Sequence, residues 1–343
     1  MPSIQILDGG LGTSLEDQYG VKFDHSKPLW STHFIIEGEE TLEACQRDFV
    51  TQGADVLLTA TYQTSIEGFQ RTKTQDYQDG IPKERIGHYM EKAVIVAENA
   101  TRDSNAKIAL SLGPYGACMI PGQEYSGKYD QDHDSEESLY QWHLERLGLF
   151  TAVPGLMERI SYVALETIPR LDELRAARRA VQDSGIKAPF WVAGVFPGDE
   201  YQLPDGSSIS AVVEAMIDPA APGARPWGIG INCTKLHKMS RLVEEFEAAT
   251  KELIAAGRLE TAPAIVLYPD GTTGEVYNTT TKTWEKPEGQ HTHGSTESWA
   301  SQLASIVKTS SAKGCFQKYL VGGCCKTSAA DIGSLKKEFS TQA

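Results

Sequence analysis

The segment SYVALETIPRLDELRAARRAVQDSGIKAPFWVAGVF, residues 161–196, contains one complete strand–helix–strand unit. Its two ends, 161–167 and 190–196, are almost continuously apolar, which is typical of parallel strands covered on both faces. Between them, residues 169–185 begin with a proline and end with a glycine, as a helix often does. We therefore interpret the segment as two parallel strands joined by a crossover helix.

The same alternation recurs along the chain and predicts the fold. Further amphipathic stretches lie at 39–53, 88–103 and 240–257. The predicted strands lie at 4–8, 54–62, 107–113, 161–167, 190–196, 227–232, 264–269 and 318–323. Eight strands alternating with helices favour the α/β class and a (β/α)₈ TIM barrel, forming one domain over 1–343. An open doubly wound sheet shares this alternation and is the alternative.

Two predicted loops are long, and both follow strands. Residues 114–136 follow the third strand and residues 270–297 follow the seventh. Both are rich in glycine, tyrosine and polar residues. In a barrel, long loops after strands usually lie over the active site, although surface decoration is the simpler alternative.

Composition and charge exclude several classes of protein. The chain has 343 residues, 40% of them hydrophobic, and a net charge of −14. Such an acidic balance argues against nucleic acid or an anionic membrane as the main partner. No basic and apolar leader is visible, and no apolar run approaches the roughly 20 residues of a membrane span. We expect a cytoplasmic protein whose six cysteines are reduced.

Polar and reactive groups stand at the C-terminal ends of the predicted strands, where a barrel places its active site. Among them are Asp8, Gly9, Gly10, Tyr62, Tyr115, Glu166, Asn232, Cys233, Cys324 and Cys325. Cys324 and Cys325 are adjacent in sequence. An unstrained disulfide needs its two Cα atoms farther apart than one peptide unit allows, so these two cysteines cannot easily bond to each other. Three thiolates from the sixth and eighth strands match the soft ligands of a catalytic zinc that keeps one position open. Gly322 and Gly323 would give the backbone the freedom to turn both sulfurs to one ion.

Other interpretations of the cysteines and histidines stay open. The three cysteines could be small buried side chains, and we expect this for Cys45 and Cys315. Cys118 lies in a candidate active-site loop, so its assignment as structural is less secure. His291 and His293 in the long seventh loop form a rival metal site, although histidines in a polar loop are usually solvated.

Six motifs resemble those of a known family, the homocysteine S-methyltransferases, over about residues 4–335. They are DGGLGTSLE, GADVLLTATYQTS, SLGPYGA, ALETIP, GINCT and LVGGCC. The resemblance implies a zinc-dependent (β/α)₈ barrel that methylates the thiol of homocysteine to make methionine. It implies that Zn²⁺ binds Cys233, Cys324 and Cys325. By the same matching, Asp8 and Glu166 lie near the homocysteine amine, Gly9 and Gly10 receive its carboxylate, and Tyr62 stands at the metal mouth.

The resemblance also indicates a methyl donor. The branch that uses glycine betaine typically has a longer C-terminal extension for oligomerisation, so we expect the branch that uses S-methylmethionine or S-adenosylmethionine. A monomer or weak homodimer follows from the same comparison. Trp30, Tyr115 and Tyr125 are candidates for facing the sulfonium by cation–π attraction, and plain packing is their alternative role.

The implied mechanism uses the zinc-bound substrate thiolate as the nucleophile, and no general base of the protein is predicted. A selenocysteine or another thiol acceptor is an alternative substrate. A catalytically silent zinc barrel that binds homocysteine as a sensor or partner module is an alternative of another class. Asp8 and Glu166 could also form a glycosidase-like acid–base pair, but that leaves the three cysteines unexplained.

Overall fold

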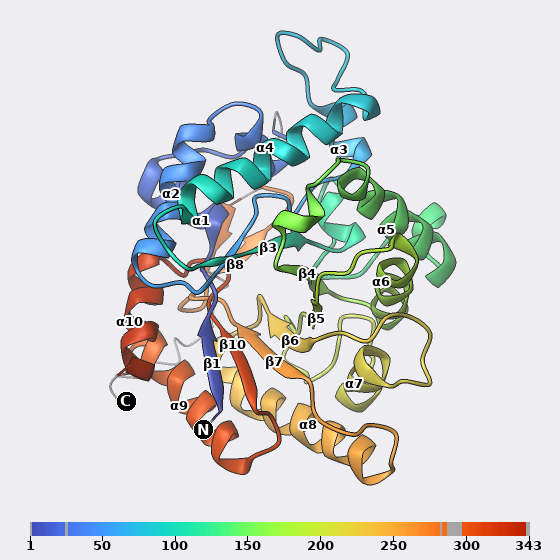
Figure 1. Cartoon of the computed structure of the whole chain (residues 1–343), viewed down its shortest axis with the longest axis vertical. Coiled ribbons are helices and arrows are strands. Elements are labelled where there is room, and N and C mark those ends of the chain that lie inside the picture. Colours follow the sequence, from blue (N-terminus) through green and yellow to red (C-terminus); the bar gives the residue numbers. More distant parts are fainter. Residues whose placement is uncertain (1, 25–26, 282, 287–296, 341–343) are drawn as a thin grey trace.

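Eight parallel strands form the centre of the computed structural model, and the main helices surround them (Figure 1). The structure describes residues 2–24, 27–281, 283–286 and 297–340. Every predicted strand is confirmed, with ends that differ by at most a few residues. The strands are β1 (Ser3–Ile6), β2 (Val56–Leu58), β3 (Lys107–Leu112), β4 (Tyr162–Ile168), β5 (Phe190–Gly194), β6 (Gly228–Asn232), β7 (Ala264–Tyr268) and β10 (Lys318–Val321).

The strand order distinguishes a barrel from an open sheet. The order is β1-β10-β7-β6-β5-β4-β3-β2, and every pair is parallel. A parallel bridge between Leu7 and Val56 joins the two ends of this order. The Asp8 N–H also donates to the Val56 carbonyl at 3.1 Å. The ring therefore closes, which confirms the (β/α)₈ prediction.

The helices lie outside the ring. They are α1 (Leu11–Tyr19), α2 (Glu39–Thr51), α3 (Ile66–Arg71), α4 (Lys83–Thr101), α5 (Glu136–Thr151), α6 (Leu171–Ser184), α7 (Ile209–Ile217), α8 (Leu236–Ala255), α9 (Trp299–Lys313) and α10 (Ala329–Ser340). Short 3₁₀ turns are η1 (Trp30–Ile35), η2 (Tyr115–Cys118), η3 (Gln131–His133) and η4 (Met157–Arg159). α6 ends at Gly185 with a φ of 76°, a left-handed conformation that favours glycine.

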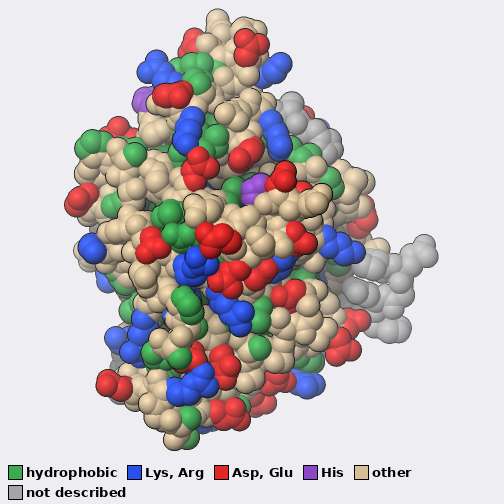
Figure 2. All heavy atoms as spheres, turned by 90° about the vertical axis from the view of Figure 1, so that its right-hand side faces the viewer, with side chains coloured by type: hydrophobic (Ala, Val, Ile, Leu, Met, Phe, Trp, Pro, Cys, Tyr) green, Lys and Arg blue, Asp and Glu red, His purple; other side chains and the backbone are tan. Residues whose placement is uncertain are grey.

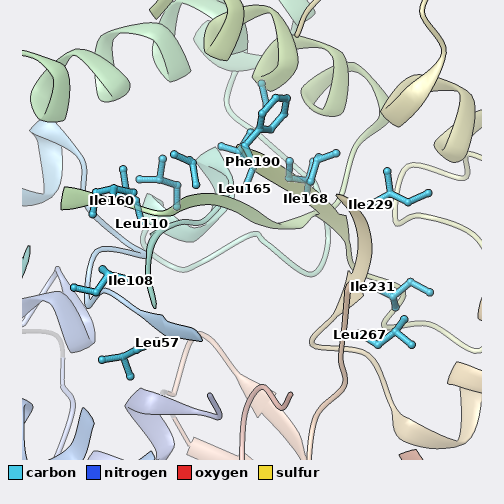
Figure 3. Packing of buried hydrophobic residues seen from close by; sticks show 14 of the residues in the cluster. Leu57, Ile108, Leu110, Ile160, Leu165, Ile168, Phe190, Ile229, Ile231 and Leu267 are labelled. Carbon is cyan, nitrogen blue, oxygen red and sulfur yellow. The ribbon is translucent and has the colours of Figure 1, made fainter. Parts of the chain in front are cut away.

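Alternate residues of each strand face two different cores. Ile229, Ile231 and Leu267 point from the barrel toward the helices and belong to the large outer core (Figure 3). Val266 and Tyr268 belong to a smaller group inside the barrel. The strands look continuously apolar in sequence because both faces are buried. The filled interior leaves the C-terminal ends of the strands as the place for a site.

The two long loops are present, and each contains short elements. Residues between β3 and α5 include η2 and η3. The loop after β7 contains an antiparallel hairpin of β8 (Val276–Asn278) and β9 (Thr283–Glu285). The hairpin was not predicted. The Thr279 hydroxyl donates to the Gly122 carbonyl at 3.0 Å, so the two loops touch each other.

Charged side chains of both signs are interspersed on the face drawn in Figure 2. Charged side chains also pair across helices, as when Arg179 on α6 contacts Glu136 and Glu137 on α5. Within the described residues, no helix is both long and apolar enough to cross a membrane.

Candidate active site

One cavity lies at the C-terminal ends of the strands and gathers nearly all the predicted site residues. Those that line it are Asp8, Gly9, Gly10, Trp30, Tyr62, Tyr125, Glu166, Cys233, Cys324 and Cys325. Their roles remain predictions, but their convergence from β1, β2, β4, β6 and β10 follows directly from the closed barrel. Tyr115 does not line the cavity. Its hydroxyl contacts Asp130 and its ring stacks on His133, so it has no place in the proposed donor pocket.

Three sulfur atoms converge in this cavity. The Sγ atoms of Cys233, Cys324 and Cys325 all lie within 4.8 Å of one another. Three thiolates around a tetrahedral zinc, with Zn–S near 2.3 Å, would lie about 3.8 Å apart. The donor set therefore fits a zinc ion, with a fourth position left for a substrate.

Cys233 and Cys324 form a disulfide in this structure, with a Cα–Cα distance of 5.4 Å. The prediction that all six cysteines are reduced is therefore wrong for this pair. The physical reason is that β6 and β10 bring two distant residues within bonding distance. Cys45, Cys118, Cys315 and Cys325 are free, and zinc binding would require the Cys233–Cys324 pair to be reduced.

The glycines before the cysteines are packed closely against neighbouring segments of the chain. A Cβ on Gly323 would lie 2.1 Å from the Thr327 hydroxyl oxygen, and one on Gly322 would lie 2.6 Å from the Asp8 carbonyl oxygen. Neither glycine has a positive φ, so their predicted conformational freedom is not what the site uses. The left-handed residues beside these glycines and cysteines are Cys233 itself, with φ of 45°, and Lys326, with φ of 62°. The strand β10 ends at Val321, so Cys324 and Cys325 already lie outside strand geometry.

Asp8 and Glu166 are two buried carboxylates on the cavity wall. The Leu58 N–H donates to Asp8 Oδ2 at 2.8 Å, whereas Oδ1 accepts no hydrogen bond from any described residue. Burial raises the pKa of Asp8 well above its usual value, and the charge of Glu166 adds to this rise. Burial also raises the pKa of Glu166 to about 7, although the Ser111 and Tyr268 hydroxyls partly offset it. A cationic ligand would favour the ionised forms.

Gly9 and Gly10 lie against the loop that carries the cysteines. A Cβ on Gly9 would lie 2.7 Å from the Thr327 carbonyl oxygen, and one on Gly10 would lie 2.5 Å from that of Cys324. The Gly10 N–H already donates to the Thr327 carbonyl at 3.0 Å. The Gly9 N–H is therefore the better candidate for the predicted contact with the homocysteine carboxylate, and it lies beside the N-terminus of α1.

Two positioning residues, Asn232 and Arg146, were given no role from the sequence. The Asn232 side chain accepts from the Thr167 N–H at 2.7 Å and donates to its hydroxyl at 2.6 Å, and Thr167 has a φ of 62°. Buried Arg146 on α5 donates to the Gly113 and Tyr62 carbonyls at 2.5 and 2.6 Å. Asn232 ends a strand and Arg146 lies within a helix, and neither residue looks unusual in the sequence. Their roles depend on burial, which the sequence does not show.

The rival histidine site cannot be placed, because His291 and His293 lie outside the described residues. Among the described residues, the cysteine trio alone meets the geometric requirement for three metal-binding side chains.

Comparison with known proteins agrees with this geometry. The family model described as "Homocysteine S-methyltransferase" matches residues 5–339. The homocysteine S-methyltransferase of Escherichia coli is 30% identical over 339 residues, which cover 97% of this chain and 94% of the relative. The betaine-homocysteine S-methyltransferase of Drosophila melanogaster is 28% identical, covering 97% and 93% of the two chains. Chain length therefore does not separate the donor branches.

A solved structure is also similar. The homocysteine methyltransferase MmuM from Escherichia coli, in its metallated form, superposes with a TM-score of 0.68 at 25% identity, covering 98% of this chain and 96% of that chain. Its oxidized form gives a TM-score of 0.68 at 26% identity, covering 97% and 95%.

Proposed function

Because the chain belongs to the homocysteine S-methyltransferase family, we propose that it methylates the thiol of L-homocysteine with a sulfonium donor, S-methylmethionine or S-adenosylmethionine. Methionine is the product. The observation that carries this proposal is the convergence of three cysteine sulfurs within 4.8 Å in a cavity that also holds two buried carboxylates. We further propose that residues 1–343 act as one domain, as a monomer or weak homodimer in the cytoplasm.

Cys233, Cys324 and Cys325 would hold the zinc ion once the Cys233–Cys324 pair is reduced. A bound zinc ion would supply the positive charge that keeps the homocysteine sulfur deprotonated at neutral pH. Two observations support this assignment. The three sulfurs fit the spacing of a zinc site, and the similar Escherichia coli protein has been solved in both metallated and oxidized forms.

Homocysteine would be oriented through its ammonium and its carboxylate, which are both on the α-carbon, at the opposite end from the thiol. Its ammonium would pair with Asp8, whose Oδ1 accepts no hydrogen bond from any described residue, and with Glu166. Its carboxylate would approach the Gly9 amide and the N-terminus of α1, where backbone N–H groups and the helix dipole favour an anion. This places the thiol near the cysteines.

The transfer itself is a direct displacement. The homocysteine thiol releases its proton to solvent, and the sulfur lone pair forms a bond to the donor's methyl carbon. The bond from that carbon to the sulfonium breaks, and its electron pair stays on the leaving sulfur as a neutral thioether. The protein's contribution is alignment of the two sulfurs with the methyl group. Buried walls such as Tyr268, 1% exposed, exclude water.

Methionine formation tests the proposal. Reduced, zinc-loaded protein is mixed with homocysteine and, in separate reactions, S-methylmethionine, S-adenosylmethionine and glycine betaine. We expect methionine with at least one sulfonium. No product with either sulfonium would contradict the donor assignment, and product with betaine alone would assign that donor instead.

The same assay separates the alternatives. A silent homocysteine-binding module would bind homocysteine in a calorimetric titration and form no product with any donor. An enzyme for another acceptor would form product faster with selenocysteine than with homocysteine.

A further inference from the structure

The cavity contains a third buried carboxylate, Glu124, for which homocysteine supplies no partner. Homocysteine has one ammonium, and Asp8 and Glu166 already suit it. Glu124 is only 8% exposed, and its Oε2 accepts no hydrogen bond from any described residue. A buried carboxylate with an unpaired oxygen is costly when ionised. The side chain therefore calls for a second cation in the same cavity.

Glu124 lies close to the reacting end of the cavity. Burial, and then the charge of Glu124, raise the pKa of Tyr62, and Glu124, Tyr62 and Cys325 line the same space. Asp8 and Glu166 lie instead at the ends of β1 and β4. The carboxylate of Glu124 therefore belongs to the loop side of the cavity, near the cysteines.

Residue 122 is a glycine, so it has no side chain that could cover the Glu124 carboxylate. A Cβ on Gly122 would lie 2.5 Å from Glu124 Oε2 and 3.3 Å from Oε1. Even an alanine at position 122 would press on the carboxylate. The Gly122 carbonyl accepts from Thr279, which fixes the residue against the loop after β7.

The loop that carries Glu124 is held at several points. Glu173 on α6 accepts from the Tyr115 N–H at 2.7 Å and from the Tyr129 hydroxyl. The Arg170 guanidinium donates to the Gly127 carbonyl at 3.3 Å. The carboxylate is therefore positioned before a ligand arrives, as an effective electrostatic contact requires.

We propose that the Glu124 carboxylate faces the positively charged sulfonium of the methyl donor and selects sulfonium over neutral thioether. This inference rests on the proposed function. The methyl group must reach a substrate sulfur beside the cysteines, so the donor's sulfonium has to enter the part of the cavity where Glu124 lies. After transfer the donor is a neutral thioether, which the carboxylate no longer attracts, so the same residue favours product release.

The charge on the donor falls as the methyl group leaves, so Glu124 stabilises the bound donor more than the transition state. Its removal should therefore raise KM for the donor and leave kcat unchanged or slightly higher. A proton acceptor would behave differently, because its loss lowers kcat and changes the pH profile.

Glu124→Gln, which keeps the shape and removes the charge, is compared with wild type and with Glu67→Gln, an exposed glutamate on α3. We expect the donor KM to rise about tenfold to hundredfold in Glu124→Gln. The homocysteine KM and the zinc content should not change. An unchanged donor KM, or a fall in kcat at constant KM, would overturn the inference.

A binding measurement separates this inference from the proposed function. Dimethylsulfoniopropionate and 3-methylthiopropionate differ by one methyl group, which makes the sulfur of the former a positively charged sulfonium, and neither has an amine for Asp8 and Glu166. Ligand-observed NMR titration of the reduced protein should show wild type preferring the sulfonium about tenfold or more, and Glu124→Gln losing that preference. Equal preference in both proteins would contradict the role of Glu124 even if turnover is absent. Gly122→Ala, which crowds the carboxylate in a folded protein, should weaken the preference in the same direction.

Discussion

Asp8, Glu124 and Glu166 are carboxylates that the fold buries around one cavity, and burial raises the pKa of each. An ionised carboxylate that is buried without a partner destabilises the folded protein. A cationic ligand in the cavity offsets that cost because it pairs with the ionised form. This arrangement suits an amino acid with an ammonium together with a sulfonium donor.

Glu166→Gln tests the ammonium pocket. The variant keeps the hydrogen-bonding shape toward Ser111 but removes the charge, so the homocysteine KM should rise about tenfold to hundredfold. The donor KM should change much less. Steady-state kinetics with each substrate varied in turn measures both values. Glu145→Gln, on the exposed side of α5, is the control, and an equal rise of both KM values in Glu166→Gln would argue against the assignment.

Part of the candidate site could be predicted from the sequence. Asp8, Glu166 and the three cysteines follow strand ends, and the barrel rule places such residues in one cavity. Glu124 could not be predicted, because a glutamate in a polar loop looks solvated until the fold buries it. Tyr115 follows a strand end too, but the 3₁₀ turn η2 directs its hydroxyl to Asp130 and away from the cavity.

At the scale of elements, the loop after β3 depends on a buried anchor. Glu173 on α6 is fully buried and accepts from the Tyr115 N–H, the Tyr129 hydroxyl and the His143 ring. These contacts join α5, α6 and the loop that carries Glu124. The orientation of Glu124 therefore depends on a residue that touches no substrate.

Glu173→Gln should loosen this anchor. The amide NH₂ accepts no hydrogen bond, so at least one of the three contacts is lost and we expect a loss of about 1–3 kcal/mol in the free energy of unfolding. The donor KM should rise while the homocysteine KM changes little. Urea denaturation and steady-state kinetics measure the two effects, with Glu137→Gln on exposed α5 as the control. Wild-type stability in Glu173→Gln would show that the anchor contributes little.

Elements with a clear period could be predicted, and irregular ones could not. Helices α2, α4, α6 and α8 have one apolar face and were predicted. α5 buries His143 and Arg146 beside its apolar residues, so its pattern is obscured. The strands β8 and β9 have only three residues each, too few to show an alternation.

At the scale of the whole molecule, the buried carboxylates make stability depend on pH. Burial raises the pKa of Glu124 and of Glu166 to about 7, above the usual value of 4.5. The folded state therefore binds more protons than the unfolded state between these values, so its stability is full below about pH 4.5 and falls as pH rises through about 7. Each group contributes on the order of 1–3 kcal/mol to this fall.

Glu124→Gln should reduce this loss of stability with rising pH, because glutamine does not titrate. Urea denaturation of ligand-free protein at pH 5 and pH 7.5 gives the change in the free energy of unfolding for wild type and variant. The change should be smaller in the variant by the contribution of one carboxylate. A variant with the same pH dependence as wild type would indicate that Glu124 is solvated.

The architecture could be predicted because alternating buried strands and helices admit few folds. The sequence alone could not decide between a closed barrel and an open sheet. That choice depends on pairing between the first and second strands, seen here in the Leu7–Val56 bridge. The cysteines meet for another reason: β7 pairs with both β6 and β10, and this brings the Sγ atom of Cys233 to within 4.8 Å of those of the two cysteines that follow β10.

The central claim is that these three cysteines hold the zinc on which homocysteine methylation depends. The most direct measurement determines zinc content and methionine formation on the same reduced samples of wild type, Cys324→Ala and Cys315→Ala. Cys315, a free cysteine outside the cavity, is the control. We predict about one zinc per chain and turnover in wild type and Cys315→Ala, and loss of both in Cys324→Ala. Full zinc retention or undiminished methionine formation in Cys324→Ala would contradict the claim.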